Sequence, residues 1–451
     1  MKISIIGTGY VGLVSGVCLA LKGHEVVCVD NNEEIVDKIN NSKAAIYEPY
    51  LDEYLETAVA DGKLTATTDM EYAVGNTDVS IVAVGTPFNN NGIDLCFIRK
   101  VVEDLGRLIK EKEAYHVVCI KSTVVPATTD TFVRGIIESE SGKKAGEFGL
   151  VMNPEFLREG EAVTDFMKPD RIVIGAYDDK SYNVFKEVYE GKFDAPIMRV
   201  SLRTAEMIKY ASNSFLALLI SYSNEIAAIS ESVGGMDVEE ILGSVSLDRR
   251  LTTRFMGEII KPEIIKYLKA GRGFGGSCFP KDVKALIEFS RQHGYSPKLL
   301  EDTIRVNERQ IKRITGKLEK EIGCIEGKKI MILGLAFKPF TDDIRESPSI
   351  KLMNELSGKK ARIYCADPIV TDNTIKELQS GENISYIRDY NIILKDMDAV
   401  LLMTPWPEYV QLDEDDRIKG CAGTVFFDCC RAWNKNKITE FGIKYIGIGL
   451  S

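Results

Sequence analysis

The sequence predicts an α/β protein in which two doubly wound, largely parallel sheets are joined by a long central helix. Apolar strands alternate with helical patterns from Lys2 onward and again from Lys328 onward, an order typical of parallel sheets with helices on both faces. Between them, residues 202–233 keep a helical pattern without proline and run into Gly234-Gly235, which is long for a crossover helix. We therefore expect three parts, with the bounds 1–197, 198–310 and 311–451.

The bulk composition excludes several classes of function. The chain has 451 residues, enough for two or three domains, and a net charge of −10, so it has no overall basic surface for nucleic acid or membranes. No apolar run reaches the roughly 20 residues of a membrane span, and we expect no signal peptide. We predict a cytoplasmic protein without nucleic-acid or membrane partners.

The ten cysteines and three histidines narrow the chemistry further. The cysteines are scattered without a metal-type CxxC pair, so we expect a reducing compartment and no metal site. None of the histidines falls in a catalytic motif, and we expect His24, His116 and His293 on loops or on the surface. Histidine-based acid–base catalysis is therefore not expected.

The N-terminal strand Lys2–Ile6 leads into a GxGxxG turn that opens a helix, and the next strand ends in an acid. In such a unit Gly7 and Gly9 let a pyrophosphate approach the backbone, and Gly12 lets the helix pack closely on the strand. The helix N-terminus binds the phosphates. Asp30 would accept the ribose hydroxyls and repel a 2′-phosphate. These features predict a Rossmann-like domain that binds NAD rather than NADP; the alternative is a glycine-rich turn followed by an unrelated acid.

Two later loops also leave the carboxyl ends of predicted strands. The strand 79–84 leads into Gly85-Thr86-Pro87, and the strand 116–120 leads into Lys121-Ser122-Thr123. Open α/β sheets bind ligands at this edge, so Thr86 and Thr123 are candidate hydroxyl contacts. Each of them could equally be a helix cap.

The middle of the chain offers two further polar groupings. Glu155 and Glu159 lie four residues apart in the segment 153–160 and would share a face if that turn were helical; the alternative is a solvated, charged turn. Lys209 and Asn213 have the same spacing on the long helix, among apolar residues, and together could form an oxyanion site. The alternative for the lysine is a side chain that extends along the surface to water.

The segment 273–282, Gly-Phe-Gly-Gly-Ser-Cys-Phe-Pro-Lys-Asp, predicts a nucleophile beside a ligand. Its glycines allow close backbone approach, and Pro280 suits the first turn of a helix. Cys278 would then lie at the positive end of that helix, which favours the thiolate. Asp282 lies one turn further on. Taken alone, a structural cysteine on a tight turn explains the cysteine as well.

The C-terminal third repeats the strand–helix order loosely but has no GxGxxG. We expect a second nucleotide-binding lobe there. Lys338 and Arg431 follow predicted strands and are candidates to contact a phosphate or a base.

Taken together, these motifs make the whole chain similar to the UDP-glucose/GDP-mannose dehydrogenase family. The resemblance rests on the GxGxxG turn with Asp30, on Gly85-Thr86-Pro87 and Ser122-Thr123-Val124, and on the segments 153–160, 273–282 and 334–348 with Lys209 and Asn213. It implies an NAD domain, a central helical dimerisation domain that carries the cysteine loop, and a domain that binds a UDP-sugar. It further implies a homodimer or a higher homo-oligomer.

The activity that the resemblance implies is the four-electron oxidation of the C6 alcohol of UDP-glucose to UDP-glucuronate with NAD. Cys278 would form a thiohemiacetal and then a thioester, Lys209 and Asn213 would stabilise the oxyanion, Asp282 would be the base, and Glu159 with Thr123 would direct the hydrolytic water. The cofactor contacts implied are Gly7, Gly9, Tyr10, Val11, Gly12, Asp30, Thr86, Pro87, Thr123, Glu159, Lys281 and Arg345. The substrate contacts implied are Glu155, Phe156, Leu157, Lys209, Asn213, Arg250, Tyr267, Gly275, Lys338 and Arg431, with Arg250 reaching the neighbouring subunit.

The chain departs from the family pattern at residues 252–265, which look like an insertion between Arg250 and the glycine segment. The same chemistry on GDP-mannose or a UDP-N-acetylhexosamine is therefore the nearest alternative. A protein that binds NAD and a UDP-sugar without catalysis is the alternative from another class, although it would not need Cys278. A two-electron alcohol dehydrogenase would also leave this cysteine without a role.

Overall fold

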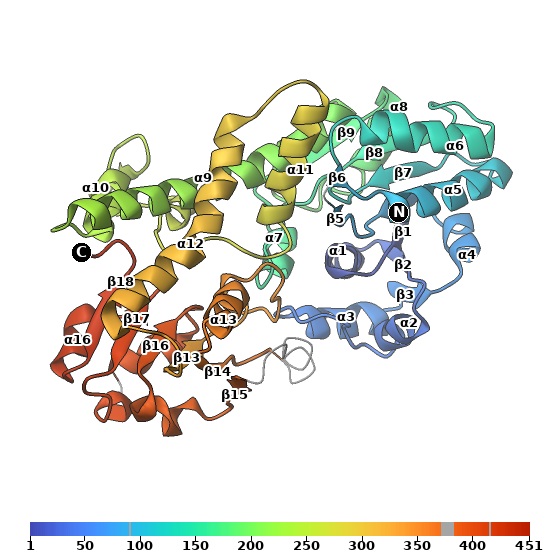
Figure 1. Cartoon of the computed structure of the whole chain (residues 1–451). Coiled ribbons are helices and arrows are strands. Elements are labelled where there is room, and N and C mark those ends of the chain that lie inside the picture. The colour runs from blue at the N-terminus through green and yellow to red at the C-terminus, as the bar shows by residue number, and fades with distance from the viewer. Residues whose placement is uncertain (90–91, 371–382, 415) are drawn as a thin grey trace. The chain divides into compact units, whose positions relative to one another are not determined.

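The computed structural model describes residues 1–89, 92–370, 383–414 and 416–451, with its helices and strands labelled in Figure 1. The chain divides into two compact units, Met1–Ser212 and Asn213–Ser451. Helix α9 (Leu202–Val233) runs through this division. Its bounds are those that the sequence pattern predicts, because no proline interrupts the helix and Gly234 and Gly235, both at positive φ, end it.

An eight-stranded sheet forms the middle of the first unit. Its order is β10-β9-β8-β7-β4-β1-β2-β3, and β8 with β9 is its antiparallel pair. The chain order reverses between β1 and β4, the place where open α/β sheets bind ligands. The strands are β1 (Lys2–Ile6), β2 (Glu25–Val29), β3 (Leu64–Thr67), β4 (Val79–Val82), β7 (Val117–Ile120), β8 (Gly149–Met152), β9 (Ile172–Ala176) and β10 (Ile197–Val200).

Alternate residues of β1 enter different apolar cores, because successive side chains of a strand point to opposite faces. Ile3 and Ile5 pack in the core that contains Leu13 of α1, whereas Ile6 packs in the core that contains Ile98 of α5. Helices therefore cover both faces of the sheet. They are α1 (Tyr10–Leu21), α2 (Glu33–Asn40), α3 (Leu51–Ala60), α4 (Met70–Gly75), α5 (Cys96–Glu111), α6 (Arg134–Ser141), α7 (Ala162–Met167) and α8 (Asp179–Lys186), with a short hairpin of β5 (Phe88–Asn89) and β6 (Gly92–Ile93) and a turn of π-helix at Thr128–Val133.

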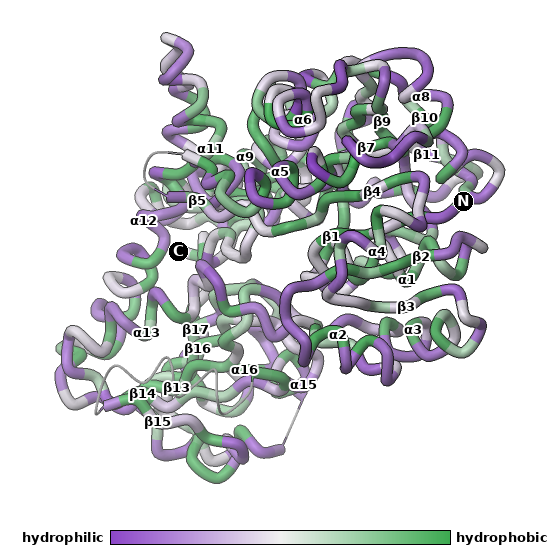
Figure 2. The backbone as a smooth tube through the Cα atoms, turned by 90° about the vertical axis from the view of Figure 1, so that its right-hand side faces the viewer, coloured by the Kyte–Doolittle hydropathy of each residue, from purple (hydrophilic) through white to green (hydrophobic). Residues whose placement is uncertain are grey.

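The second unit contains a six-stranded, wholly parallel sheet in the order β15-β14-β13-β16-β17-β18. Figure 2 shows that its central strands are mostly apolar along their length, as expected for strands covered on both faces. This is the doubly wound order that the sequence predicts for the C-terminal part. The strands are β13 (Lys329–Leu333), β14 (Arg362–Ala366), β15 (Ile384–Tyr386), β16 (Ala399–Leu402), β17 (Val425–Asp428) and β18 (Lys444–Gly447).

The helices of the second unit include the C-terminal part of α9, which packs along α12 (Lys298–Ile322). Glu231 of α9 accepts from Arg313 at 2.6 Å and from Lys317 at 2.8 Å, and Ser221 Oγ donates to the carbonyl of Thr303 at 2.7 Å. These polar contacts supplement apolar packing and fix the two helices against each other. The remaining helices are α10 (Val238–Ser246), α11 (Phe279–Gln292), α13 (Pro348–Gly358), α15 (Pro407–Val410) and α16 (Lys435–Glu440).

The segment 252–265, which the sequence suggests is an insertion, forms a small hairpin. Strands β11 (Thr253–Phe255) and β12 (Glu258–Ile260) pair antiparallel, and a short 3₁₀ helix at Glu263–Tyr267 follows them. Gly257 in the turn has a positive φ, which glycine adopts at no steric cost. The side chains of both strands are exposed.

The three histidines lie on loops outside the helices and strands, as the sequence predicts, but two of them are buried. His24 is 0% and His116 is 1% exposed. The strand pattern around each residue is apolar, but the pattern does not show that neighbouring elements supply hydrogen-bond partners. His116 Nε2 lies 2.7 Å from Ser80 Oγ, and its Nδ1 lies 3.1 Å from the carbonyl oxygen of Thr77. These partners let the neutral ring be buried.

Burial makes His116 a source of acid sensitivity. Burial, with the nearby Lys112 charge, lowers the pKa of His116 from 6.5 to about 3. The unfolded chain therefore binds the extra proton first, and the contribution of this group to stability is lost as the pH falls from about 6.5 to about 3, by about 1.4 kcal/mol per pH unit. We expect His116→Gln to reduce the slope of the unfolding free energy against pH by about this amount between about pH 6 and 4.

The measurement is urea unfolding over this pH range, followed by a probe in the first unit. His293→Gln is the matched control, because that ring is exposed. Equal slopes in wild type and His116→Gln would contradict the assignment.

Candidate active site

The turn after β1 leaves the first amides of α1 without side-chain partners. Gly7 has a φ of 92°, and a Cβ on it would lie 2.8 Å from Val84. A Cβ on Gly12 would lie 1.9 Å from the carbonyl oxygen of Gly7, whereas a Cβ on Gly9 would meet nothing within 4 Å. Gly9 begins α1 without a side-chain cap, so this helix N-terminus can receive a phosphate group. The turn fits the pyrophosphate of a dinucleotide.

Asp30 follows β2 beside this turn. Its Oδ2 accepts from the N–H of Thr8 at 3.0 Å and from Thr8 Oγ1 at 2.6 Å, and its Oδ1 accepts from the N–H of Asn32 at 3.1 Å. The carboxylate is thus held in place while the residue stays only half-buried. A carboxylate at this position accepts hydrogen bonds from ribose hydroxyls and repels a 2′-phosphate. The residues therefore fit NAD better than NADP.

The two predicted hydroxyl loops are joined to each other. Thr86 Oγ1 donates to the carbonyl oxygen of Thr123 at 2.8 Å, and Ser122 Oγ donates to the carbonyl oxygen of Val84 at 2.7 Å. These loops leave the neighbouring strands β4 and β7. Thr123 therefore lies at the same edge of the sheet as Gly7 and the carboxyl end of β4. Pro87, in the loop after β4, is exposed.

The segment after β8 is not helical, so the condition under which Glu155 and Glu159 would share a face is not met, and the buried Glu155 does not fit the alternative of a solvated turn either. Residues 153–158 have no regular structure. Pro154 disfavours a helical conformation at the residue before it, and Glu155 Oε2 accepts from the N–H of Leu157 at 2.6 Å, which competes with helical bonding.

Glu155 instead pairs with the lysine of α9. Its Oε1 lies 2.8 Å from Lys209 Nζ, and both residues are buried, at 8% and 3% exposed. Burial opposes ionisation of Glu155, but the Lys209 ammonium holds the pKa of this carboxyl below its usual value. The ring of Phe156 lies below two cations, with Arg171 at 4.1 Å and Lys209 at 5.8 Å from its centroid. Lys209 is therefore a buried, charged group and not a surface lysine.

A buried carboxylate that sequence analysis missed ties the dinucleotide turn to the Glu159 loop. Glu48 is 6% exposed, and its Oε2 accepts from Tyr10 Oη and from the N–H of Gly160, the latter at 2.7 Å. Its Oε1 accepts from the N–H of Ala162 at 2.7 Å. Burial, with the neighbouring Glu48 charge, raises the pKa of Tyr10. Tyr10 thus contributes to the site through its fixed backbone in the first turn of α1, while its hydroxyl holds Glu48.

Cys278 begins α11 in the second unit, as the sequence predicts. Pro280 lies in the first turn, no side chain caps the helix, and the carbonyl oxygen of Cys278 accepts from the N–H of Asp282 at 2.8 Å. The Cys278 sulfur lies 3.6 Å from Ser277 Oγ. A cysteine at a helix N-terminus lies in the positive end of the helix dipole, which favours its thiolate.

Asp282 gathers the other polar side chains of this group. It is 1% exposed, its Oδ2 accepts from Asn213 Nδ2 at 2.6 Å, and its Oδ1 accepts from Lys281 Nζ at 2.6 Å. The structure therefore brings Cys278, Asp282, Lys281 and Asn213 into one cluster at the start of α11. Asn213 lies one helical turn after Lys209 on α9.

The loop before Cys278 is made of glycine because other chain segments touch its backbone. A Cβ on Gly271 would lie 2.8 Å from the carbonyl oxygen of Cys429, and a Cβ on Gly275 would lie 2.5 Å from that of Glu346. A Cβ on Gly276 would lie 2.8 Å from the ring of Phe337. Because such contacts have no room for a side chain, the loop is fitted to the carboxyl ends of β13 and β17.

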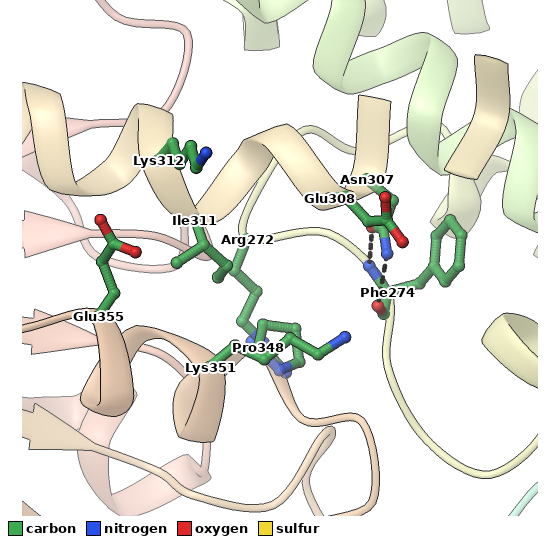
Figure 3. A pocket seen from close by; sticks show the side chains of 9 residues that line it. All are labelled: Arg272, Phe274, Asn307, Glu308, Ile311, Lys312, Pro348, Lys351 and Glu355. Atoms are coloured by element: carbon green, nitrogen blue, oxygen red, sulfur yellow. Dashed lines mark hydrogen bonds between the residues drawn. The ribbon is translucent and has the colours of Figure 1, made fainter. Parts of the chain in front are cut away.

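Asn307 of α12 fixes the same loop from another side. Its Oδ1 accepts from the N–H of Phe274 at 2.8 Å, and its Nδ2 donates to the carbonyl oxygen of Phe274 at 3.0 Å (Figure 3). These residues border a cavity of about 320 Å³, whose polar walls come from Arg272, Lys312 and Lys351 with two glutamates of α12 and α13.

Three predicted ligand contacts border this loop. The carbonyl oxygen of Arg345 accepts from the N–H of Gly276 at 2.9 Å. Lys338 Nζ lies 5.7 Å from the centroid of the Phe337 ring, and the Tyr267 ring lies 6.2 Å from an aromatic ring at the start of α11. The structure therefore groups these residues with the cysteine loop in the second unit.

Two predicted arginines are engaged elsewhere. Arg250 is exposed and pairs with Asp248 at 2.6 Å. Arg431 has a nearly buried side chain that pairs with Asp237 at 2.7 Å and with Glu239 at 3.3 Å. Both guanidinium groups are thus matched by carboxylates of the same unit.

The predictions from the sequence did not include Glu48, Asn307 or Arg272 among the residues of the site. Each of them contacts residues that are far away in the sequence. Glu48 stands before a proline without any motif around it. Only Arg272 offered a signal, as a charged residue between the glycines of the cysteine loop.

The described part of the chain has neither a metal-type cluster nor a helix suited to a membrane. No group of three or more His, Cys, Asp or Glu side chains there is arranged to hold a metal ion. No helix there combines the length and the apolar character needed to cross a bilayer.

The geometry of the first unit, with its uncapped glycine turn and Asp30, is that of an NAD-dependent oxidoreductase. Residues 1–192 match the NAD binding domain of the UDP-glucose/GDP-mannose dehydrogenase family, 203–309 match its central domain and 331–435 match its UDP binding domain. The chain belongs to the UDP-glucose/GDP-mannose dehydrogenase family. It is therefore an NAD-dependent nucleotide-sugar dehydrogenase.

Individual relatives agree with this assignment. The chain is 41% identical to the UDP-glucose 6-dehydrogenase AglM of Haloferax volcanii over 92% of this chain and 94% of that protein. It is 37% identical to the GDP-mannose 6-dehydrogenase of Pseudomonas syringae pv. syringae over 89% and 90% of the two chains. Among solved structures, a UDP-glucose dehydrogenase from the hyperthermophilic archaeon Pyrobaculum islandicum matches with a TM-score of 0.88 and 37% identity, covering 100% of this chain and 98% of that one.

Replacing Asp30 tests the cofactor choice. We expect Asp30→Ala to weaken NAD binding and to lower the ratio of NAD to NADP affinity, because the variant loses both the ribose acceptor and the repulsion of a 2′-phosphate. Titration of each dinucleotide into wild type and variant measures this ratio. An unchanged ratio would show that Asp30 does not select the cofactor.

Replacing Glu48 tests the link between Tyr10 and the Glu159 loop. In Glu48→Gln an amide N–H₂ group replaces one carboxylate oxygen and faces the N–H of Gly160 or Ala162. That backbone N–H loses its acceptor, and the negative charge that strengthened both bonds is removed. We expect a loss of about 2 kcal/mol in unfolding free energy and a slower turnover.

Asp52→Asn is the matched control, since Asp52 accepts from the N–H of Ala44 at an exposed position. Urea unfolding and steady-state rates check both variants. A Glu48→Gln protein as stable and active as the control would contradict this role.

Proposed function

We propose that this protein oxidises the C6 alcohol of UDP-glucose to the carboxylate, giving UDP-glucuronate, with the consumption of two NAD⁺ and one water. The observation that supports this most directly is the cluster at the start of α11. It places Cys278 at a helix N-terminus, one turn before Asp282, which is bonded to Asn213 and Lys281. Such a group can serve covalent catalysis, which a two-electron alcohol dehydrogenase does not need.

The first unit would hold NAD at the glycine turn, with Asp30 on the ribose and with Thr86, Pro87 and Thr123 at the edge of the sheet. The predicted contacts at Lys281 and Arg345 complete this set in the second unit. When bound, NAD accepts a hydride in each of the two oxidation steps. Tyr10 and Val11 contribute the first-turn backbone of α1, whose amides suit a phosphate.

Cys278 would act after the alcohol has become an aldehyde. Its thiolate adds to the aldehyde carbon, and the resulting thiohemiacetal carbon carries the hydrogen that leaves as the second hydride. The product of that step is a thioester, which water cleaves to the carboxylate and the free cysteine. This covalent route explains why a nucleophile is required.

The polar residues around Cys278 have separate proposed roles. Lys209 and Asn213 stabilise negative charge on the sugar oxygen, and Asp282 removes protons in the alcohol and thiol steps. Glu159 with Thr123 directs the hydrolytic water. Glu155, which pairs with Lys209, keeps that lysine charged and oriented. Phe156, Leu157, Tyr267, Gly275, Lys338 and Arg431 are proposed to border the substrate.

We propose a homodimer with α9 in its interface. Phe215, Tyr222 and Ile229 are 50%, 47% and 50% exposed and follow one another at intervals of seven residues along one stripe of the helix. Arg250 would reach the substrate of the neighbouring subunit. The functional parts would be an NAD domain at 1–197, a central domain at 198–310 and a UDP-sugar domain at 311–451, in a cytoplasmic enzyme.

The choice of UDP-glucose rests on the UDP binding domain and on the relatives that carry this activity in their names. The same chemistry on GDP-mannose is the second candidate, because a relative of similar identity is a GDP-mannose 6-dehydrogenase.

The yield of NADH with limiting UDP-glucose and excess NAD⁺ tests the proposal. We expect two NADH per sugar nucleotide, and at least a 1,000-fold lower rate of carboxylate formation in Cys278→Ser, because a hydroxyl is a much weaker nucleophile than a thiolate. One NADH per sugar, or full carboxylate formation by Cys278→Ser, would refute the covalent mechanism.

GDP-mannose and a UDP-N-acetylhexosamine serve as parallel substrates in this experiment. Two NADH from one of them and none from UDP-glucose would reassign the substrate. Stabilisation by NAD and UDP without turnover of any of the three sugars would indicate a binding protein.

A further inference from the structure

Arg272 presents a positive charge at the cysteine loop, and no carboxylate of the described residues forms an ion pair with it, although Glu308 and Glu355 line the same cavity. Arg272 Nη1 donates to Cys430 Sγ at 2.7 Å and its Nη2 donates to the carbonyl oxygen of Phe337 at 2.5 Å. Burial raises the pKa of the Cys430 thiol above its usual value, so the thiol is neutral at neutral pH. Both partners of the guanidinium are therefore uncharged.

One hydrogen-bond donor of Arg272 also has no partner among the described residues. A guanidinium has five N–H donors, and its Nε is buried without a hydrogen-bond partner. A half-buried cation with neutral partners and a buried, unpaired Nε–H carries part of its desolvation cost unrecovered. An anionic ligand would lower that cost, because charge-assisted bonds to phosphate are among the stronger hydrogen bonds.

Arg431 in the same unit also has a buried Nε without a hydrogen-bond partner, but it differs from Arg272 in the charge of its partners. Two carboxylates, Asp237 and Glu239, already contact its guanidinium, and its side chain is only 6% exposed. A ligand phosphate would have to compete with this ion pair. Of the two arginines near the end of β17, Arg272 is therefore the better anion ligand.

The position of Arg272 connects it with the reaction. It stands six residues before Cys278 on the glycine loop, and Phe337, whose carbonyl it holds, precedes Lys338. It also lines the cavity of about 320 Å³ between α12 and α13, and Figure 3 shows its side chain reaching from the loop toward Pro348. The guanidinium is thus near the open surface of the unit and not sealed in its core.

We propose that Arg272 binds the diphosphate of the nucleotide sugar and carries the anion recognition that the sequence pattern assigns to Arg431. This inference rests on the proposed function, because it takes a nucleoside diphosphate sugar as the substrate. Cys430 and the Phe337 carbonyl orient the guanidinium through one N–H each of Nη1 and Nη2, and the second N–H of each of these two nitrogens faces the phosphate oxygens. The same loop therefore positions both the nucleophile and the anchor for the nucleotide end of the substrate.

The test compares UDP binding and turnover in the full-length protein and its variants. Arg272→Gln removes the charge, and we expect the dissociation constant of UDP and the KM for UDP-glucose to rise about 30-fold, as for the loss of a charged hydrogen bond. We expect kcat to stay within about threefold and NAD affinity to be unchanged, because the diphosphate takes no part in the chemistry. Arg272→Lys keeps the charge but lacks the planar guanidinium, so its dissociation constant for UDP should lie between those of wild type and Arg272→Gln.

Arg291→Gln is the control, because it removes the same charge from an exposed arginine paired with Glu301 and should leave UDP affinity unchanged. Uridine has the base and the ribose of UDP but no diphosphate, so it reports binding of the nucleoside alone. The loss of affinity caused by Arg272→Gln should be large for UDP and small for uridine. Equal losses for both ligands, or unchanged UDP affinity in Arg272→Gln while wild type binds UDP tightly, would overturn this inference alone. A wild-type protein that neither binds UDP nor forms NADH from a nucleotide sugar would instead refute the proposed function.

Discussion

The close fit of the glycine loop to the carboxyl ends of β13 and β17 is the constraint on which the position of Cys278, the proposed nucleophile, depends. The backbone of this loop lies against Cys429, Glu346 and Phe337 with no room for a Cβ. Three separate segments of the second unit therefore determine where α11 begins. Because Cys278 starts that helix, its position is set by the sheet and not by the local turn alone, and small errors of position are costly in catalysis.

Both units use the same turn at the start of their sheets, but they complete it differently. The N–H of Gly7 donates to Val29 and the N–H of Gly334 donates to Ala366, each at 2.8 Å, and each glycine has a φ of 92°. An acid follows the second strand in both cases, yet Asp30 is half-buried whereas Asp367 is 4% exposed.

The second turn is closed by its own protein groups. Asp367 accepts from the N–H groups of Leu335 and Ala336 at 2.8 and 3.1 Å and from Trp406 Nε1 at 3.2 Å. These contacts occupy the oxygens that would face a ribose. The first unit therefore retains the geometry of a dinucleotide site, and the second retains only its architecture.

The sequence predicted those features that local patterns determine, namely the bounds of α9, the strand–turn–helix units and the start of α11 at Cys278. It failed where a distant contact decides the outcome. The sequence left open whether the turn after β8 is helical or solvated, and it is neither, because Glu155 is held by Lys209 and the Leu157 amide in a buried, non-helical segment. Glu48 and Arg272 acquire their importance from partners more than 60 residues away, and no spacing rule shows such pairs.

The ends of the two equivalent helices explain why the second unit needs cationic side chains. Helix α1 begins at Gly9 without a side-chain cap, so its amides are available to phosphate. Helix α13 begins at Ser347, whose Oγ accepts from the N–H of Ser349 at 3.2 Å and donates to the carbonyl of Leu335 at 2.6 Å. The first-turn amides of α13 are thus partly satisfied within the protein. A nucleoside diphosphate at this sheet would then need side-chain charge. The Arg272 guanidinium, which we propose for this role, has neutral partners, so a phosphate would not compete with a carboxylate for it.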